Sequence, residues 1–171
     1  MSKLLLVIDM QKDFIDGALG TDEAVAILPA VRRRIEKRQA EGWDVWFTKD
    51  THNADKYPNS MEGKWLPVPH CIKGTDGWEI HESLKDLAET VIEKPNFGSV
   101  NVAFKAAAKN YEEVELIGLC TDICVISNAM IIKAALPESE IAVVKDCCAG
   151  VSPESHENAL SAMEKCHIRI I

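Results

Sequence analysis

The chain has 171 residues, enough for a single domain over residues 1–171 whose core needs no disulfide staples. Its 19 basic and 27 acidic residues give a net charge of −8 without any Lys- and Arg-rich stripe, which argues against nucleic acid as a partner. The apolar run at residues 4–8 is too short for a signal sequence or a membrane span, so we expect no membrane partner. The six cysteines are best interpreted as reduced thiols, and we expect a cytoplasmic protein.

Short aliphatic runs alternate with segments of helical period along the chain, a pattern typical of repeated βα units. Six strands are expected, at residues 4–9, 44–48, 90–93, 114–119, 141–144 and 167–171. Apolar spacing predicts helices at residues 26–41, 81–89, 100–110, 122–135 and 153–165. The predicted fold is a three-layer, Rossmann-like α/β domain with a six-stranded, mostly parallel sheet and helices on both faces.

One long segment interrupts this alternation. Residues 50–78 contain several prolines and glycines and show little periodicity. A loop of this length inside a compact domain is usually functional.

Polar residues occur where the expected strands end. Ligands of open parallel sheets bind beyond the carboxyl ends of the strands, so Asp9, Asp50, Lys94 and Cys124 are the first candidates for a site. Asp9 follows a buried strand, although aspartate is also a common turn residue there. Lys94 precedes Pro95, which fixes the chain after the lysine, although an isolated lysine at a strand end is more often solvated.

Cys124 lies where a strand turns into a helix, in the segment 118–125 with Thr121 or Asp122 as the expected N-cap. In the first helical turn, the helix dipole and unpaired N–H groups favour a thiolate with a lowered pKa and could also receive an oxyanion. The alternative is a buried, inert cysteine, which is the interpretation we give to Cys120, Cys147, Cys148 and Cys166. No histidine is placed to pair with Cys124, so Asp9 is the expected general base.

A second group of residues suggests a metal site. Asp50 and His52 end the second strand, and His70 closes the long loop. One Asp and two His can bind zinc, and iron or manganese are alternatives, although surface loops often carry such residues without a metal. Glu62 is a further candidate ligand, whereas Cys71 should point away from its neighbour His70.

Three aromatic residues are candidates for the walls of a substrate pocket. Phe14, Trp65 and Phe97 fall near the predicted site and could sandwich a flat ring. Phe14 is the preferred wall because its loop begins at Asp9. Each of these residue types is more often found in a core than in a pocket.

Several phrases in this order resemble the isochorismatase-like cysteine hydrolase family over nearly the full chain. They are Leu-Val-Ile-Asp-Met-Gln-Lys-Asp-Phe at 6–14, Glu-Lys-Pro-Asn-Phe-Gly-Ser at 93–99, Gly-Leu-Cys-Thr-Asp-Ile-Cys-Val at 118–125, and the turn at 144–151. The resemblance implies a catalytic triad of Asp9, Lys94 and Cys124. It also implies a cis peptide bond before Cys120, an oxyanion hole formed by the backbone N–H groups of Cys120 and Cys124, and a homo-oligomer.

The segment around Asp50 and His52 resembles the metal motif of nicotinamidases within that family, which strengthens the prediction of a divalent metal cofactor. The expected substrate is a small amide, with nicotinamide converted to nicotinate and ammonia through a thioester. Another small amide, ureido or carbamoyl compound is the rival substrate, and a non-catalytic binding protein is the rival class. The segment 96–99 departs from the sequence typical of many nicotinamidases, which places the substrate, but not the triad, in question.

Overall fold

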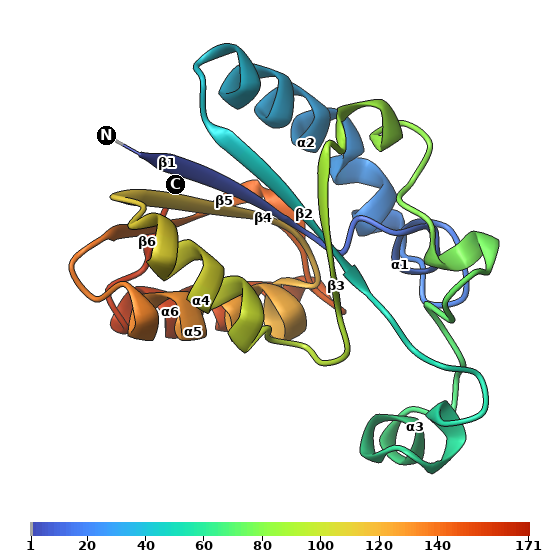
Figure 1. Ribbon diagram of the computed structural model, residues 1–171. Helices are drawn as coiled ribbons and strands as arrows, with labels where there is room; N and C mark the ends of the chain where they lie inside the picture. The colour runs from blue at the N-terminus through green and yellow to red at the C-terminus, as the bar shows by residue number, and fades with distance from the viewer. Residues whose placement is uncertain (1) are drawn as a thin grey trace.

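The computed structural model describes residues 2–171 as a parallel sheet between two layers of helices (Figure 1). The six strands are all parallel, in the order β3-β2-β1-β4-β5-β6. Their bounds are Lys3–Ile8 (β1), Asp44–Asp50 (β2), Thr90–Lys94 (β3), Glu113–Leu119 (β4), Glu140–Ala149 (β5) and Arg169–Ile170 (β6). The α-helices are Lys12–Ile15 (α1), Asp22–Ala40 (α2), Met61–Trp65 (α3), Val100–Lys109 (α4), Ile126–Ala135 (α5) and Pro153–Lys165 (α6).

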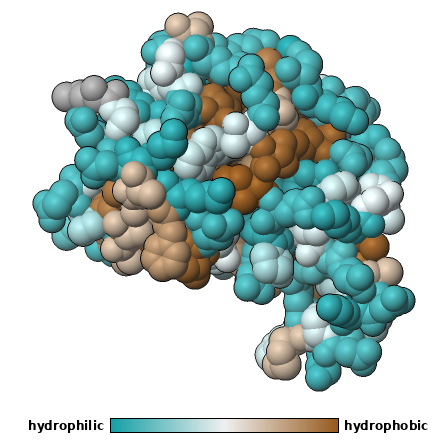
Figure 2. Space-filling model, viewed as in Figure 1, coloured by the Kyte–Doolittle hydropathy of each residue, from teal (hydrophilic) through white to brown (hydrophobic). Residues whose placement is uncertain are grey.

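The two faces of the sheet are covered by different helices, because side chains alternate between the faces of a strand. In β1, Leu5 and Val7 pack in the apolar cluster under α2, whereas Leu4 and Leu6 pack under α4, α5 and α6. Burial on both faces explains why this strand is an unbroken apolar run. Figure 2 shows apolar side chains in a band between the two helical layers and mainly hydrophilic ones on their outer surfaces. The predicted fold class is confirmed.

The register of the sheet brings the strand ends to one edge. Asp50 pairs with Lys94 at the ends of β2 and β3, and Ile8 pairs with Gly118 near the ends of β1 and β4. Asp9 follows β1 directly, and the chain after β4 leads into the turn that carries Cys124. Residues far apart in sequence therefore converge beyond the carboxyl ends of the strands.

The predicted helix at residues 81–89 is wrong. This stretch contains only a short 3-10 turn, η3 (Lys85–Leu87). Its start is held extended against the loop after β1, where Ile80 bridges Gln11 and the His81 N–H donates to the carbonyl of Met10. The start of the segment is thus anchored to the loop after β1, and the residues that follow form only turns with local hydrogen bonds such as that from the Leu84 N–H to the His81 carbonyl.

The connection from β2 to β3 is built from the long loop, with α3 and the short turns η1 (Tyr57–Asn59) and η2 (Asp76–Trp78). The prediction also missed α1 and the start of α2, and it ended β5 too early. Within residues 2–171, none of the helices combines the length and the apolar character that a bilayer crossing requires.

Gly118 allows β4 to approach β1 closely just before the site. Its φ is +118°, and a Cβ there would lie 2.1 Å from the carbonyl oxygen of Ile8. We expect Gly118→Ala to lower the free energy of unfolding by more than about 3 kcal/mol, because it adds a backbone collision to an unfavourable φ. Urea unfolding measures this loss.

Gly42→Ala is the matched control for the backbone conformation alone. Gly42 has a φ of +78°, but a Cβ at this position would meet no atom within 4 Å, so its loss should be about 1–2 kcal/mol. Equal losses for the two variants would contradict the proposed collision.

Candidate active site

A buried lysine lies at the centre of the site. Lys94 Nζ is 2.6 Å from Asp9 Oδ2 and donates a hydrogen bond to Cys124 Sγ at 3.6 Å. It also donates to the carbonyl of Asn96 at 2.9 Å and lies 3.5 Å from Asp50 Oδ1. The side chains of Lys94 and Asp9 are inaccessible to solvent, and Cys124 is buried. The structure therefore brings together the three residues of the predicted triad.

Thr48 fixes the orientation of Asp9. Its hydroxyl donates to Asp9 Oδ1 at 2.6 Å and accepts a hydrogen bond from the Asp9 backbone N–H at 3.2 Å. Asp9 Oδ2, in contrast, lies buried in the ion pair with Lys94. The sequence analysis missed Thr48. Strand alternation was the available clue, because residues 48 and 50 of β2 lie on the same face.

The charges of the site are set by burial and by the neighbouring ions. Burial would lower the pKa of the Lys94 ammonium, but the negative charges of Asp9, Cys124 and Asp50 outweigh it and raise that pKa. Burial raises the pKa of the Asp9 carboxyl, whereas the charge of Lys94 and the hydrogen bond of Thr48 act against this rise. Lys94 is thus a permanent cation at neutral pH.

The environment of Cys124 differs from the predicted one. Its thiol lies in a single π-helical turn, η4 (Thr121–Val125), which precedes α5. Burial and the negative charge of Asp9 raise the pKa of the thiol well above its usual value, although Lys94 lowers it. The expected thiolate of lowered pKa is therefore wrong, because loss of water and a nearby carboxylate outweigh the helix terminus.

The capping prediction is also wrong. The cap position is Cys120, and no side chain caps this turn. Thr121 instead hydrogen-bonds His156 at 2.7 Å, and Asp122 accepts from the backbone of Val151 and the hydroxyl of Ser155. The peptide bond between Leu119 and Cys120 is cis, as the resemblance implied.

The remaining cysteines have varied surroundings. Cys147 and Cys148 are buried, as expected of inert cysteines, whereas Cys166 is exposed and Cys120 is half-buried in the wall of a cavity. The prediction that all four lie in the core is wrong for Cys166 and Cys120. A cysteine near the end of an amphipathic helix has no sequence feature that tells its buried face from its exposed one.

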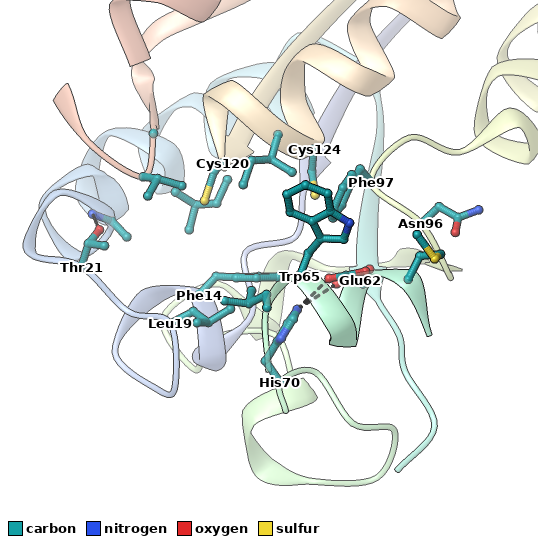
Figure 3. A pocket seen from close by; sticks show the side chains of 18 residues that line it. Phe14, Leu19, Thr21, Glu62, Trp65, His70, Asn96, Phe97, Cys120 and Cys124 are labelled. Carbon is teal, nitrogen blue, oxygen red and sulfur yellow. Dashed lines mark hydrogen bonds and ion pairs between the residues drawn. The ribbon is translucent and has the colours of Figure 1, made fainter. Parts of the chain in front are cut away.

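A second cluster lies beside the triad. One oxygen or nitrogen from each of Asp50, His52, Glu62 and His70 lies within 4.8 Å of the others. His52 Nε2 is 2.9 Å from Asp50 Oδ2, and His70 Nε2 is 3.2 Å from Glu62 Oε1 (Figure 3). Cys71 is outside this group, as the sequence analysis expected. The predicted metal ligands thus converge, including Glu62.

Gln11 holds the backbone of this cluster in place. Its side-chain amide accepts from the Asp50 N–H at 2.7 Å and donates to the carbonyls of Asp50 and Trp78, each at 2.9 Å. The sequence analysis quoted Gln11 but gave it no role. Its neighbours in space are distant in sequence, so no local pattern identifies them.

The donor set fits a divalent cation. Burial would lower the pKa of each histidine, but hydrogen bonds to Asp50 and Glu62 raise the pKa of His52 to about 9 and that of His70 to about 10. Two carboxylates thus draw positive charge to this point, and the second oxygen of Asp50, Oδ1, is buried 3.5 Å from the Lys94 ammonium. Carboxylate and imidazole ligands of this kind suit zinc, iron or manganese.

A cavity of about 730 Å³ opens between the two clusters. Phe14, Trp65 and Phe97, the three predicted pocket residues, all line it, together with Cys124 and the metal-cluster residues Asp50, Glu62 and His70. Figure 3 shows Trp65, Cys124 and Glu62 among the side chains that line the cavity. Trp65 is 85% exposed, so one face of its ring is free.

Comparison with known proteins identifies the family of this chain. Residues 3–171 match the isochorismatase domain. The chain belongs to the isochorismatase family. The resemblance seen in the sequence is thereby confirmed over almost the full length.

Solved structures of the isochorismatase family share the fold described above. A nicotinamidase from Bacillus subtilis is similar with a TM-score of 0.87 and 29% identity, over 99% of each chain. A pyrazinamidase from Pyrococcus horikoshii in complex with zinc gives a TM-score of 0.83 and 27% identity, over 100% of this chain and 99% of that one. An N-carbamoylsarcosine amidase from Thermoplasma acidophilum gives 0.78 and 26%, over 99% of this chain and 95% of that one.

The raised pKa values of His52 and His70 predict how stability depends on pH when a chelator is present. Both pKa values exceed the ordinary histidine value of 6.5, so the stabilisation is complete below pH 6.5 and is lost as pH rises through about 9 and 10. A bound zinc ion should remove this dependence, because it replaces the protons. Urea unfolding across this pH range, with chelator or zinc, tests the prediction.

His70→Asn should weaken both the pH dependence and the stabilisation by zinc, whereas the control His81→Asn should preserve them. His81 hydrogen-bonds Ser83 outside the cluster. If the pH dependence were the same with chelator and with zinc, the assignment of this cluster as a metal site would be wrong.

Proposed function

We propose that this isochorismatase-family hydrolase cleaves a small carboxamide with Cys124 as the nucleophile, Asp9 as the general base and Lys94 as a fixed cation. The observation that supports it is the buried contact set around Lys94 Nζ, 2.6 Å from Asp9 Oδ2 and 3.6 Å from Cys124 Sγ. In the resting state, the positive charge of Lys94 balances the negative charge of Asp9, and the thiol of Cys124 is neutral. Because both Asp9 and Cys124 contact the same ammonium, the thiol proton has only a short distance to travel to the carboxylate.

The first half of the reaction forms a thioester. As the sulfur attacks the carbonyl carbon, the carboxylate of Asp9 takes the thiol proton. The backbone N–H groups of Cys120 and Cys124 receive the oxyanion, whose charge they stabilise. Asp9 then gives the proton to the departing nitrogen, and ammonia leaves as the C–N bond breaks.

The second half hydrolyses the thioester. Asp9 takes a proton from water, the resulting hydroxide attacks the acyl carbon, and the proton returns to the leaving sulfur of Cys124. Lys94 keeps its charge throughout and keeps Asp9 ionised at the start of each half. The raised pKa of Cys124 implies that proton transfer accompanies attack, in place of a preformed thiolate.

Asp50, His52 and His70 would hold a divalent metal ion, zinc in the first place, with Glu62 as a direct or water-mediated ligand. When bound, the ion would coordinate a ring nitrogen of the substrate and so orient its carboxamide toward Cys124. The zinc complex of the similar pyrazinamidase supports this assignment.

Nicotinamide is the leading substrate, with nicotinate and ammonia as products. The similarity to a nicotinamidase and a pyrazinamidase, together with a ring-sized space beside Phe14 and Trp65, supports this choice. The similar N-carbamoylsarcosine amidase favours a ureido or carbamoyl substrate as the second candidate. Asn96 and Phe97, in the segment that departs from many nicotinamidases, line the cavity and bear on the choice.

Ammonia release from a panel of amides and ureido compounds tests the proposal. We expect turnover of nicotinamide that chelation abolishes and zinc restores. Cys124→Ala, Asp9→Asn and Lys94→Met should each lower kcat by about a hundredfold or more, because each removes one part of the proton path or its charge balance.

Cys166→Ala is the control, because this cysteine is exposed and outside the cavity. Full turnover by Cys124→Ala would exclude a thioester. Turnover of ureido compounds alone would replace nicotinamide by the second candidate.

Thr48 is proposed as a positioning residue for Asp9, and Thr48→Val tests it. The hydroxyl lowers the pKa of Asp9, so its removal should raise that pKa and move the acid limb of the kcat/KM profile to higher pH. We expect kcat/KM to fall about tenfold. The pH profile is the measurement that separates positioning from a general loss of stability.

Thr48→Ser should restore both the rate and the acid limb, because it keeps the hydroxyl. Thr75→Val is the control, since Thr75 bonds only the carbonyl of Ile72 in an exposed turn. An acid limb at the same pH in Thr48→Val and in the parent would contradict this role.

A further inference from the structure

The cavity is larger than the substrate proposed for it. A pyridine carboxamide, with about nine non-hydrogen atoms, occupies on the order of 150 Å³ at the packing density of proteins. The cavity measures about 730 Å³, within the range of pockets for larger ligands. Much of it remains free when a single ring lies between Cys124 and the metal cluster.

The unused part has apolar walls, and we call it the apolar lobe. We define it by the cavity-lining residues Leu19, Thr21, Ala24, Cys120, Ile123 and Val151. In Figure 3, Leu19, Thr21 and Cys120 lie on one side of the cavity and Asn96 on the other. The hydroxyl of Thr21 already caps α2, where it accepts a hydrogen bond from Ala24 N–H at 3.0 Å.

The cavity offers no partner for a negative charge on the substrate. Among the described residues that line it, there is neither a lysine nor an arginine, and the two acidic ones are Asp50 and Glu62. His70 also lines the cavity, but its ring already faces both of these carboxylates, at 3.6 Å and 3.2 Å. A divalent ion would balance those two carboxylates without leaving an excess of positive charge. The nearby Lys94 ammonium already contacts Asp9, Asp50 and Cys124.

We propose that the preferred substrates are neutral aromatic amides that carry an uncharged, apolar substituent, which occupies the apolar lobe. This inference rests on the proposed function, because it takes the carboxamide to lie at Cys124 and the ring nitrogen to face Asp50. In nicotinamide, the ring nitrogen is position 1 and the carboxamide is attached at position 3. Position 5 therefore lies across the ring from position 2, which is between the nitrogen and the carboxamide. A substituent there points away from both and toward the free volume.

A series of nicotinamides tests the proposal on the zinc-loaded enzyme. The substituents at position 5 are hydrogen, methyl, ethyl, propyl and, as the charged probe, carboxylate. We expect kcat/KM to rise by up to about fourfold for each methylene buried in the lobe. The carboxylate should lower kcat/KM at least about tenfold relative to ethyl, because its charge is buried without a partner.

Val151→Trp and Val25→Trp form a matched pair of variants. Both valines are exposed, but only Val151 lines the cavity. Val151→Trp narrows the lobe, so it should lower kcat/KM for the propyl compound relative to nicotinamide. We expect the ratio of the two kcat/KM values to fall at least about fivefold, which corresponds to the lost burial of roughly one to two methylenes. Val25→Trp should leave this ratio unchanged.

Binding to Cys124→Ala, measured by calorimetry, gives a readout that does not depend on turnover. The propyl compound should bind more tightly than nicotinamide. If nicotinamide were hydrolysed but the propyl compound neither bound nor reacted better, the apolar lobe would be refuted and the proposed function would stand. If no amide reacted but the propyl compound bound more tightly and Val151→Trp abolished this gain, the proposed function would fail and the lobe would stand.

Discussion

The site depends on one buried ammonium shared between two carboxylates. Lys94 ends β3, Asp50 ends β2 and Asp9 follows β1, so three adjacent parallel strands deliver these charges to one point. The ammonium lies 2.6 Å from Asp9 and 3.5 Å from Asp50, and all three side chains are almost completely buried. Without the lysine, two desolvated carboxylates would repel each other, and one of them would be protonated. Lys94 therefore favours the charged form of Asp9, and it acts together with His52 and His70 to keep Asp50 charged.

This shared cation also couples the two halves of the site. Asp50 contributes one oxygen toward Lys94 and the other toward His52, so a change in the charge of the metal cluster reaches Asp9 through a single ammonium. Gln11, whose side chain hydrogen-bonds both the N–H and the carbonyl of Asp50, belongs to the loop that begins at Asp9. The geometry of Asp9, the proposed base, and that of the proposed metal ligands are thus set by the same short segment, and a shift in one displaces the other.

The sequence predicted the features that depend on strand ends, and it failed where distant segments decide the outcome. A polar residue after an apolar run identified Asp9, Asp50 and Lys94, because parallel strands end at a common edge. The segment at residues 81–89 has helical periodicity, yet its backbone pairs with the loop after β1. The pKa of Cys124 was predicted from the helix terminus alone, whereas burial beside Asp9 decides it.

The burial that raises the pKa of the thiol also supports the proposal of a neutral substrate. In the proposed reaction, proton transfer from Cys124 to Asp9 would move charge over a short distance beside Lys94. A second negative charge, brought by the substrate, would raise the cost of forming the oxyanion next to Asp9. The apolar walls would therefore support the proposed selection of substrate, because they leave an added charge without a partner. The hydrogen bond from Thr48 and the ion pair with Lys94 are the polar contacts that Asp9 retains to keep this arrangement charged.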